Sequence, residues 1–456
     1  MAASVSVLLP QGRGQGLAEL HRFRNDFYDC LTARQDALFE LGDALLVADQ
    51  VPSLPYLSLD PVHRRGHGSV YAALSHGRID SDAVRDLLAD ALPRSTPPVF
   101  AVDCSTWPRC DAECSPERGL FYHPSRHSAG QPIVAGWSYQ LICALEFTRD
   151  SWTTPLDARR LTPDDNVNLV ATAQIKDLLP RLDVPDGVPA FVFDAGYDPT
   201  RLQVELADAG VQILVRIRSD RCFYTAAPPR AAGTGGRPRR HGAKMALPDP
   251  TTWPAPTAIH TRDDNQYGHI DVTAWSGLHP KQRTYRDPDG QLTIVTGTVI
   301  RVQVSTLPGR SRQPTTLWLW WAGPANTPPD LDLCWRAYTR RFDLEHTVRF
   351  CKQTLRWTLP RPRTPQQADR WTWLIIAAYT QLRRLRYHVA DLQLPWEKPC
   401  APHQLTPGRV RRRFRAAHAA VGTPASDPKP CGRSPGRPTG TPRGPTPRHP
   451  ALKKTT

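Results

Sequence analysis

The chain has 456 residues, enough for two or three domains, and 40% of them are hydrophobic, which can supply a sizeable core. Its formal net charge is +15, and this surplus favours a polyanionic partner, with nucleic acid as the first candidate. A membrane surface is the weaker alternative, because the sequence has no basic amphipathic anchor and no membrane-length apolar run. The N-terminus lacks a signal-peptide pattern, so we expect a cytoplasmic protein whose ten cysteines are reduced thiols.

The first 95 residues are predicted to be helical. Apolar residues recur at helical spacing in residues 17–31 and 34–48. Residues 63–93 fit a helix, a short glycine turn and a second helix capped by Asp80 or Ser81, with arginines and histidines along the approach. Either a helix-turn-helix DNA-binding motif or a plain helical pair explains this pattern.

Residues 96–220 alternate predicted strands and helices. Two short apolar strands end in Asp103 and Asp194, and two further strands, 131–147 and 151–161, are predicted to be antiparallel neighbours. Asp198 precedes a proline and a helix, which predicts a helix cap. Carboxylates that follow neighbouring strands of an α/β sheet commonly form ligand and metal sites, so the sequence predicts Asp103 and Asp194 as candidate acids.

A cysteine and histidine pattern between these strands has a loosely zinc-like order. Its members are Cys110, Cys114, His123 and His127. The two cysteines are separated by three residues instead of the usual two, and the surrounding sequence predicts an irregular loop. A polar loop with incidental thiols is therefore the favoured interpretation, and a zinc site is the alternative.

The segment from 331 to 357 is predicted to be a helix with two stripes. At about 100° per residue, one stripe is polar and the adjacent one is apolar, while Asp343 points away from both. A solvated face with ion pairs is the alternative explanation of the polar stripe. The polar stripe consists of Tyr338, Arg341, Glu345 and Lys352, and the apolar stripe consists of Ala337, Leu344, Val348, Cys351 and Leu355.

Three acids, Asp103, Asp194 and Glu345, together suggest a reaction. Carboxylate oxygens bind hard divalent cations, and two such ions can activate a water or a 3′-hydroxyl at a phosphodiester. The sequence contains no P-loop, no dinucleotide-binding glycine pattern and no nucleophile elbow. In a basic chain, a three-acid site favours phosphodiester chemistry on DNA.

The spacing of the polar stripe matches Y-(2)-R-(3)-E-(6)-K, and in this respect the chain resembles a large group of bacterial insertion-sequence transposases with an RNase H-like DDE domain. The resemblance covers roughly residues 98–390. It implies that Asp103, Asp194 and Glu345 are the catalytic residues and bind two Mg²⁺ or Mn²⁺ ions. It also implies that Tyr338, Arg341 and Lys352 hold phosphates of the transposon end.

The resemblance also implies an organisation along the chain, with a β-rich insertion between the second and third acids. Trp318, Trp320 and Trp321 lie in an apolar run of this insertion, where burial explains them at least as well as stacking on a flipped base. The expected segments are a helical DNA-binding region (1–95), the first part of an α/β, RNase H-like catalytic domain (96–220), the insertion (221–325), the second part with the third acid (326–395), and a basic C-terminal region with a disordered tail (396–456).

Further DNA contacts are expected near the C-terminus. Arg383, Arg384 and Arg386, followed by the Arg409–Arg415 cluster, are predicted to contact the DNA backbone, with a solvated basic face as the alternative. The resulting hypothesis is a cut-and-paste transposase that acts as a homodimer on double-stranded DNA, at terminal inverted repeats and at target DNA. Its rival is a decayed or domesticated copy that binds DNA without catalysis.

Overall fold

The computed structural model divides into two compact units. The first unit comprises Met1–Pro93, Cys104–Asp165 and Asp343–Thr456, and the second comprises Arg94–Asp103 and Asn166–Phe342. The structure describes residues 13–92, 98–122, 132–183, 187–230, 239–281, 286, 290, 292–307, 316–325, 327–430, 438–440 and 444–452.

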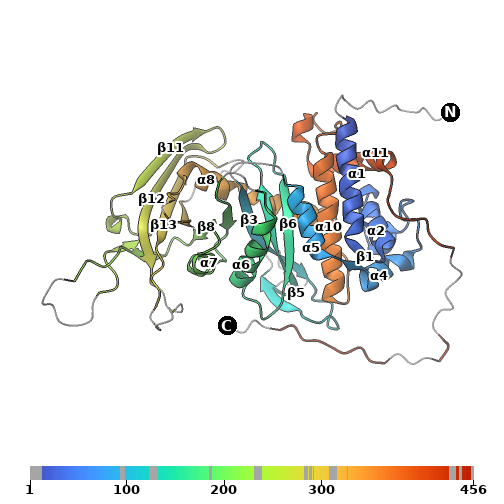
Figure 1. Ribbon diagram of the computed structural model, residues 1–456, viewed down its shortest axis with the longest axis horizontal. Coiled ribbons are helices and arrows are strands. Elements are labelled where there is room, and N and C mark those ends of the chain that lie inside the picture. The colour runs from blue at the N-terminus through green and yellow to red at the C-terminus, as the bar shows by residue number, and fades with distance from the viewer. Residues whose placement is uncertain are drawn as a thin grey trace. The chain divides into compact units, whose positions relative to one another are not determined.

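A bundle of helices forms one part of the first unit. The central helix is α10 (Pro365–Leu385), which contacts α1, α2, α4 and α11 and is buried over most of its length (Figure 1). It begins with a capping box, in which Thr364 and Gln367 satisfy each other's backbone N–H groups. The other helices of the unit are α1 (Arg13–Asp29), α2 (Gln35–Val47), α3 (Leu54–Leu57), α4 (His67–His76), α5 (Ser81–Asp90), α11 (Pro407–Val421) and the short η3 (Pro402–Gln404).

Strands form the other part of the first unit. The strand β3 (Val99–Pro108) begins in the second unit and continues in the first beyond Asp103, where its neighbour is β5 (Ile133–Leu145). The predicted antiparallel pair is confirmed, because β5 pairs with β6 (Thr153–Leu161) over most of its length. The remaining strands of this unit are β4 (Gly119–Tyr122), β1 (Leu31–Ala33) and β2 (Arg78–Ile79).

The pair of helices considered as a DNA reader is α4 and α5, joined through β2. The exposed residues of α5 include Asp82, Asp86 and Asp90, at steps of four. An acidic exposed face repels DNA phosphates, so α5 is a poor match to a recognition helix. The plain helical pair is therefore the better description, and Asp80 caps α5 as expected.

Parallel strands form the first part of the second unit. The strand β7 (Ala190–Phe193) pairs in parallel with β3 on one side and with β8 (Gln212–Ile217) on the other. The helices α6 (Val167–Leu178) and α7 (Pro199–Glu205) follow β6 and β7 in the chain, with the short η1 (Leu179–Arg181) after α6. Asp198 caps α7 as predicted, by accepting the N–H groups of Thr200 and Arg201.

The β-rich character predicted for residues 221–325 is confirmed in the described part of this segment. Its strands pair antiparallel in the order β10-β9-β12-β13-β14, and β14 continues onto β8. Trp318 and Trp320 belong to its buried core, and Trp321 is also buried, which confirms the burial interpretation of the three tryptophans. The strands are β9 (Cys222–Tyr224), β10 (Lys244–Ala246), β11 (Ala258–Asp264), β12 (Gly268–Pro280), β13 (Gly297–Val304) and β14 (Leu317–Ala322), with η2 (Pro250–Thr252) between β10 and β11.

The helix predicted over 331–357 is interrupted, which corrects the single-helix prediction. The structure has α8 (Leu331–Arg340) and α9 (Phe342–Gln353), with Arg341 between them in a turn. The second helix ends four residues earlier than predicted, and Arg356 then adopts a left-handed backbone conformation with φ of 56°. This mixed α/β organisation is consistent with an RNase H-like domain.

The described parts of the C-terminal tail make specific contacts. The N–H groups of His449 and Leu452 donate to the carbonyls of Glu113 and Arg118, and Arg64 pairs with Asp427. The expected disorder of the tail is therefore not shown. Among the helices that the structure describes, none combines the length and the apolar character needed to cross a membrane.

Candidate active site

Asp103 and Asp194 occupy neighbouring positions in the second unit. The pairing of β3 with β7 ends at Val102 and Phe193, and each acid is the next residue along the chain. Asp103 does not end its strand as the sequence predicted, because β3 continues to Pro108, but it does mark the end of the pairing with β7. Adjacent strands lie about 4.8 Å apart, so both carboxylates belong to one small region.

Each of these carboxylates accepts a hydrogen bond within the protein. Asp194 accepts the backbone N–H of Gly196 at 2.9 Å through Oδ1, and its Oδ2 has no hydrogen bond among the described residues. Asp103 accepts from Arg341 Nη1 at 2.8 Å through Oδ2. Both side chains are partly exposed, which lets an ion or a ligand reach them.

Arg341 links the end of α8 to Asp103. Its side chain is only 5% exposed, and its guanidinium lies over the rings of Tyr338 and Phe342, at 5.6 and 5.0 Å from the ring centroids. The local fold places it there, because its N–H donates to the carbonyls of Ala337 and Tyr338 at the end of the helix. The predicted phosphate contact is thus, in this structure, the ion-pair partner of a predicted catalytic acid.

Tyr338, which the sequence analysis placed in the polar stripe, is buried, with 2% of its surface exposed. Its hydroxyl finds no hydrogen-bond partner among the described residues. A buried hydroxyl without a partner costs free energy of folding, so this position invites a functional explanation.

The region around Tyr338 is held in place by an acid at the other end of α8. Asp332 accepts from Arg262 of β11, from Arg336 and from the indole of Trp335, at 3.1 to 3.2 Å. Burial would raise the pKa of Asp332, but the three donors outweigh it and lower that pKa. The sequence analysis missed this residue, because Asp332 near a helix start resembles an ordinary first-turn acid, and its partner on β11 is 70 residues away.

Glu345 lies in the first turn of α9, in the first unit, and its side chain is exposed. The apolar stripe of α9 is confirmed, since Leu344 and Cys351 are buried. Asp343, predicted to point away from both stripes, is also buried. The four residues of the predicted polar stripe therefore differ in exposure and do not form a uniform solvated face.

Lys352 is half-buried near the other end of α9. Its ammonium donates to the carbonyl of Thr106 at 2.8 Å and lies 6.0 Å from the centroid of the Trp357 ring. Burial disfavours the charged form and lowers the pKa of Lys352 to about 8. This lysine therefore titrates just above neutral pH.

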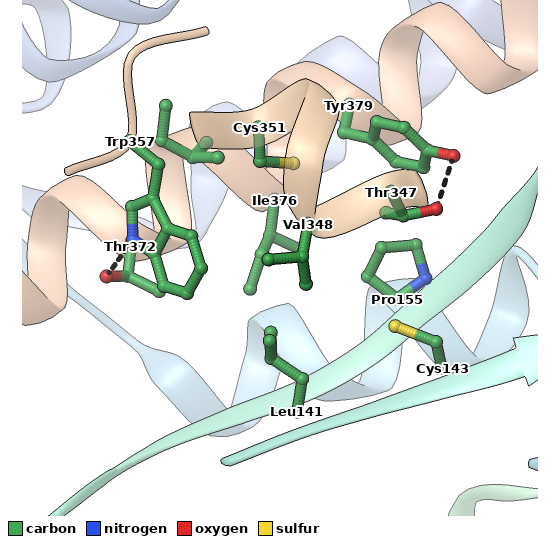
Figure 2. Close-up of a pocket in the computed structure, with 11 residues that line it drawn as sticks. Leu141, Cys143, Pro155, Thr347, Val348, Cys351, Trp357, Thr372, Ile376 and Tyr379 are labelled. Atoms are coloured by element: carbon green, nitrogen blue, oxygen red, sulfur yellow. Dashed lines mark hydrogen bonds between the residues drawn. The ribbon is translucent and has the colours of Figure 1, made fainter. Parts of the chain in front are cut away.

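The buried side of α9 is fixed by hydroxyl contacts around a small apolar cavity in the first unit (Figure 2). The cavity measures about 20 Å³, which is about one water molecule, and its walls include Cys143 and Cys351. Thr347 contacts the hydroxyls of Thr153 and Tyr379, at 2.9 and 3.1 Å. Figure 2 shows the Thr347–Tyr379 contact beside the cavity. These contacts fix the rotation of the helix that carries Glu345.

The donor set suits a hard divalent cation in part. Two adjacent carboxylates supply the oxygen ligands that Mg²⁺ and Mn²⁺ prefer. In the ranges that the structure describes, no group of three or more His, Cys, Asp or Glu side chains is arranged to hold a metal ion. The structure thus pairs Asp103 with Asp194, and the contribution of Glu345 to a metal site stays a prediction.

Two of the arginines expected to contact DNA have a partner inside the first unit. Arg383 and Arg386 are buried, and both guanidiniums donate to the carboxylate of Glu146. Burial would raise the pKa of Glu146, but the two guanidiniums outweigh it and hold that pKa below its usual range. Arg384 is half-buried over the ring of Phe23, at 5.0 Å from its centroid. The burial of Arg383 and Arg386 fits a structural task better than a DNA contact.

The Arg409–Arg415 cluster is also engaged within the first unit. Arg409 pairs with Asp391 and Arg412 pairs with Glu397, both at the short separation of an ion pair. Arg411 donates to backbone carbonyls, and burial lowers its pKa to about 10. These cations contribute less to an external field than their number in the sequence suggests.

The loosely zinc-like pattern is described only in part. Cys110 and Cys114 are exposed free thiols in the loop after β3. His123 and His127 lie outside the described residues. The structure therefore adds no support to a zinc site here.

Comparison with protein families gives a match over the region that carries the two adjacent acids. A model described as DDE superfamily endonuclease matches residues 26–281, more than half of the chain. The matched range includes Asp103 and Asp194 and ends before Glu345. No curated protein matches the chain.

Proposed function

Because the chain belongs to the DDE superfamily endonuclease family, we propose that it is a DNA transposase that cuts at the ends of an insertion sequence and joins them to target DNA. The observation that carries the proposal is the adjacent pair Asp103 and Asp194 on parallel strands. The basic composition suits the polyanionic substrate.

In this proposal Asp103, Asp194 and Glu345 bind two Mg²⁺ or Mn²⁺ ions. When bound, such ions activate the attacking oxygen and stabilise the leaving oxygen at a phosphodiester. Support for Glu345 comes from the chain itself, since it lies four residues after Arg341, which contacts Asp103. Its exposed side chain is accessible to a ligand.

Three residues of the Y-(2)-R-(3)-E-(6)-K pattern position DNA in this proposal. Arg341 donates to the Asp103 carboxylate, and its planar guanidinium is suited to hold a phosphate oxygen beside that carboxylate. The hydroxyl of Tyr338 has no hydrogen-bond partner among the described residues, and it would donate to a phosphate oxygen. Lys352 adds a positive charge, and the protonated fraction of this lysine depends on pH.

The wider assembly is part of the same proposal. The helical region 1–95 binds the terminal inverted repeats, and two copies of the chain bring two ends together as a homodimer. A copy that binds DNA without cutting it is the competing function, and it predicts DNA affinity without metal-dependent cleavage.

The decisive test compares two neighbouring aspartates. Asp194→Asn removes a proposed metal ligand with little change in shape, so we expect metal-dependent nicking of end DNA to fall by at least about a hundredfold. Binding of the same DNA in EDTA should stay within about threefold, because other cations supply the affinity. The measurement is single-turnover cleavage in Mg²⁺ and in Mn²⁺, beside fluorescence anisotropy in EDTA.

The matched control is Asp198→Asn, four residues away. It removes the same charge, yet Asn still caps α7 well, so cleavage should stay near the parent rate. Asp103→Asn and Glu345→Gln complete the series and should behave like Asp194→Asn. Parent-level cleavage by Glu345→Gln would remove that residue from the site, and parent-level cleavage by Asp194→Asn would refute the catalytic assignment.

A further inference from the structure

A row of basic and aromatic side chains crosses three strands of the second unit. Tyr224 on β9 pairs in register with Lys244 on β10 and with His279 on β12. Residues directly opposite each other in antiparallel strands share a face of the sheet, so these three side chains lie side by side. Tyr224 is half-buried and Lys244 is exposed.

A second histidine completes the cluster. Nδ1 of His241 lies 2.9 Å from Nε2 of His279, and the His241 ring lies 5.2 Å from the Tyr224 ring, centroid to centroid. His279 is 1% exposed, and its Nδ1 has no partner among the described residues. A neutral imidazole carries one N–H, so this pair shares one proton across the contact and leaves a buried ring nitrogen unsatisfied.

The charges around the imidazole pair are positive. The ammonium of Lys281 lies 5.1 Å from the centroid of the Tyr224 ring, and Lys281 is exposed. Burial lowers the pKa of His241, and Lys281 and Arg240 lower it further. Burial and His241 lower the pKa of His279. Among the described residues, no carboxylate is one of the groups that act on these two imidazoles.

We propose that this cluster binds a backbone phosphate of duplex DNA and that the imidazole pair takes up a proton when it does so. The proposal rests on the proposed function only in taking DNA as the ligand. The neighbouring ammonium and guanidinium disfavour a divalent cation at the two histidines, whereas they attract an anion. Lys244, Lys281 and His241 are the groups accessible to the phosphate, and Tyr224 provides a ring beside it.

The direction of the pH dependence follows from proton linkage. In the free protein the lowered pKa values keep both imidazoles neutral at pH 7. A bound phosphate favours the charged form and raises the pKa, so binding consumes a proton. DNA affinity should therefore rise as the pH falls from 8 to 6.

The test measures binding of a fluorescein-labelled random-sequence duplex to the full chain in EDTA, at pH 6, 7 and 8. The variant is His241→Gln, and the control is His269→Gln, an exposed histidine on the same strand as His279. We expect the parent and the control to gain about fivefold more affinity than His241→Gln on going from pH 8 to pH 6. An equal gain in all three proteins would overturn the proposal.

Two further variants keep the test decisive if His241→Gln folds poorly. Lys281→Ala and Lys244→Ala change exposed side chains, and each should lower the slope of log affinity against log salt by about 1. Unchanged slopes would count against the cluster. Added inorganic phosphate, at constant ionic strength, should leave the pH dependence of DNA affinity unchanged. If this pH dependence disappeared when phosphate was added, the site would be assigned to free phosphate instead of DNA. Because no cleavage is measured, failure here is distinct from failure of the catalytic assignment.

Discussion

Arg341 and Asp103 show how one residue can serve two parts of a reaction. The buried guanidinium of Arg341 pairs with the Asp103 carboxylate in the protein without ligand, with Nη1 2.8 Å from Oδ2. Removing the arginine would therefore disturb the proposed metal site as well as the proposed phosphate contact. For this reason Arg341→Ala cannot separate DNA binding from catalysis, whereas Lys352 is the better probe, because its contacts among the described residues are to a backbone carbonyl and an aromatic ring.

Lys352 should make DNA binding weaken as the pH rises above neutral. Its pKa is lowered to about 8, so the free protein loses this charge between pH 7 and pH 9. If the ammonium holds a phosphate, affinity for end DNA should fall by about threefold to tenfold over that range. Lys352→Arg keeps its charge throughout and should remove most of the fall. The measurement is anisotropy in EDTA at constant ionic strength.

The same lowered pKa has a consequence for stability. The unfolded lysine keeps a pKa near 10.5, so between about pH 8 and pH 10.5 the unfolded chain binds more protons than the folded one. The contribution of Lys352 to the free energy of unfolding should therefore increase as the pH rises through this window.

An affinity for DNA that falls equally in the parent and in Lys352→Arg would show that Lys352 does not contact the phosphate.

Glu146 is expected to matter for stability and not for DNA binding. It is the buried partner of Arg383 and Arg386, and Glu146→Gln would remove this partner from both, leaving Arg386 with the more distant Asp150. The expected loss is about 3–5 kcal/mol in the free energy of unfolding, measured by urea denaturation. Arg149→Ala, an exposed change in the loop after β5, should stay within about 0.5 kcal/mol. If the folded Glu146→Gln variant bound DNA much more tightly, Arg383 and Arg386 would be DNA contacts after all.

At the scale of elements, the α8–α9 break separates two kinds of anchoring. α8 is held to β11 by the Asp332 cluster, within the second unit. α9 is held within the first unit by hydroxyl contacts and by the wall of the small cavity. An uninterrupted helix would have made Tyr338, Arg341 and Glu345 one rigid row.

The anchoring of α9 can be tested through Thr347. Thr347→Val keeps the side-chain shape but leaves the hydroxyls of Thr153 and Tyr379 without this partner, so it should cost about 1–3 kcal/mol of unfolding free energy. Tyr379→Phe removes one hydroxyl and leaves Thr347 its contact with Thr153, so a smaller loss of about 1 kcal/mol is expected. Thermal and urea denaturation measure both. A larger loss for Tyr379→Phe would reverse this ranking and contradict the shared role of Thr347.

At the scale of the whole molecule, the net charge of +15 overstates the number of cations available to DNA. Arg24 is buried against Asp43, and Arg409 and Arg412 are paired with acids. Many arginines therefore stabilise the protein by pairing with its own acids. Lys244 and Lys281, which lie on β10 and just after β12, are fewer, but both are exposed.

Much of the architecture was predictable, because periodicity and caps are local properties of a sequence. The antiparallel strands β5 and β6, the cap at Asp198, the β-rich segment and the buried tryptophans all follow the predicted pattern. The position of Asp103 within a longer strand did not follow it. Strand ends depend on the partner strands, and β3 extends beyond the end of its pairing with β7.

The sequence by itself determined the acids, the basic composition and the alternation of strands and helices, since these depend on residue type and short-range spacing. Only the tertiary structure decided which charges are already paired. It assigned Arg341 to Asp103, and Arg383 and Arg386 to Glu146, across more than 200 residues of chain. It also brought together His241 and His279, which lie 38 residues apart and belong to no recognisable sequence motif. Such pairings depend on strand register and helix packing, which no local pattern encodes.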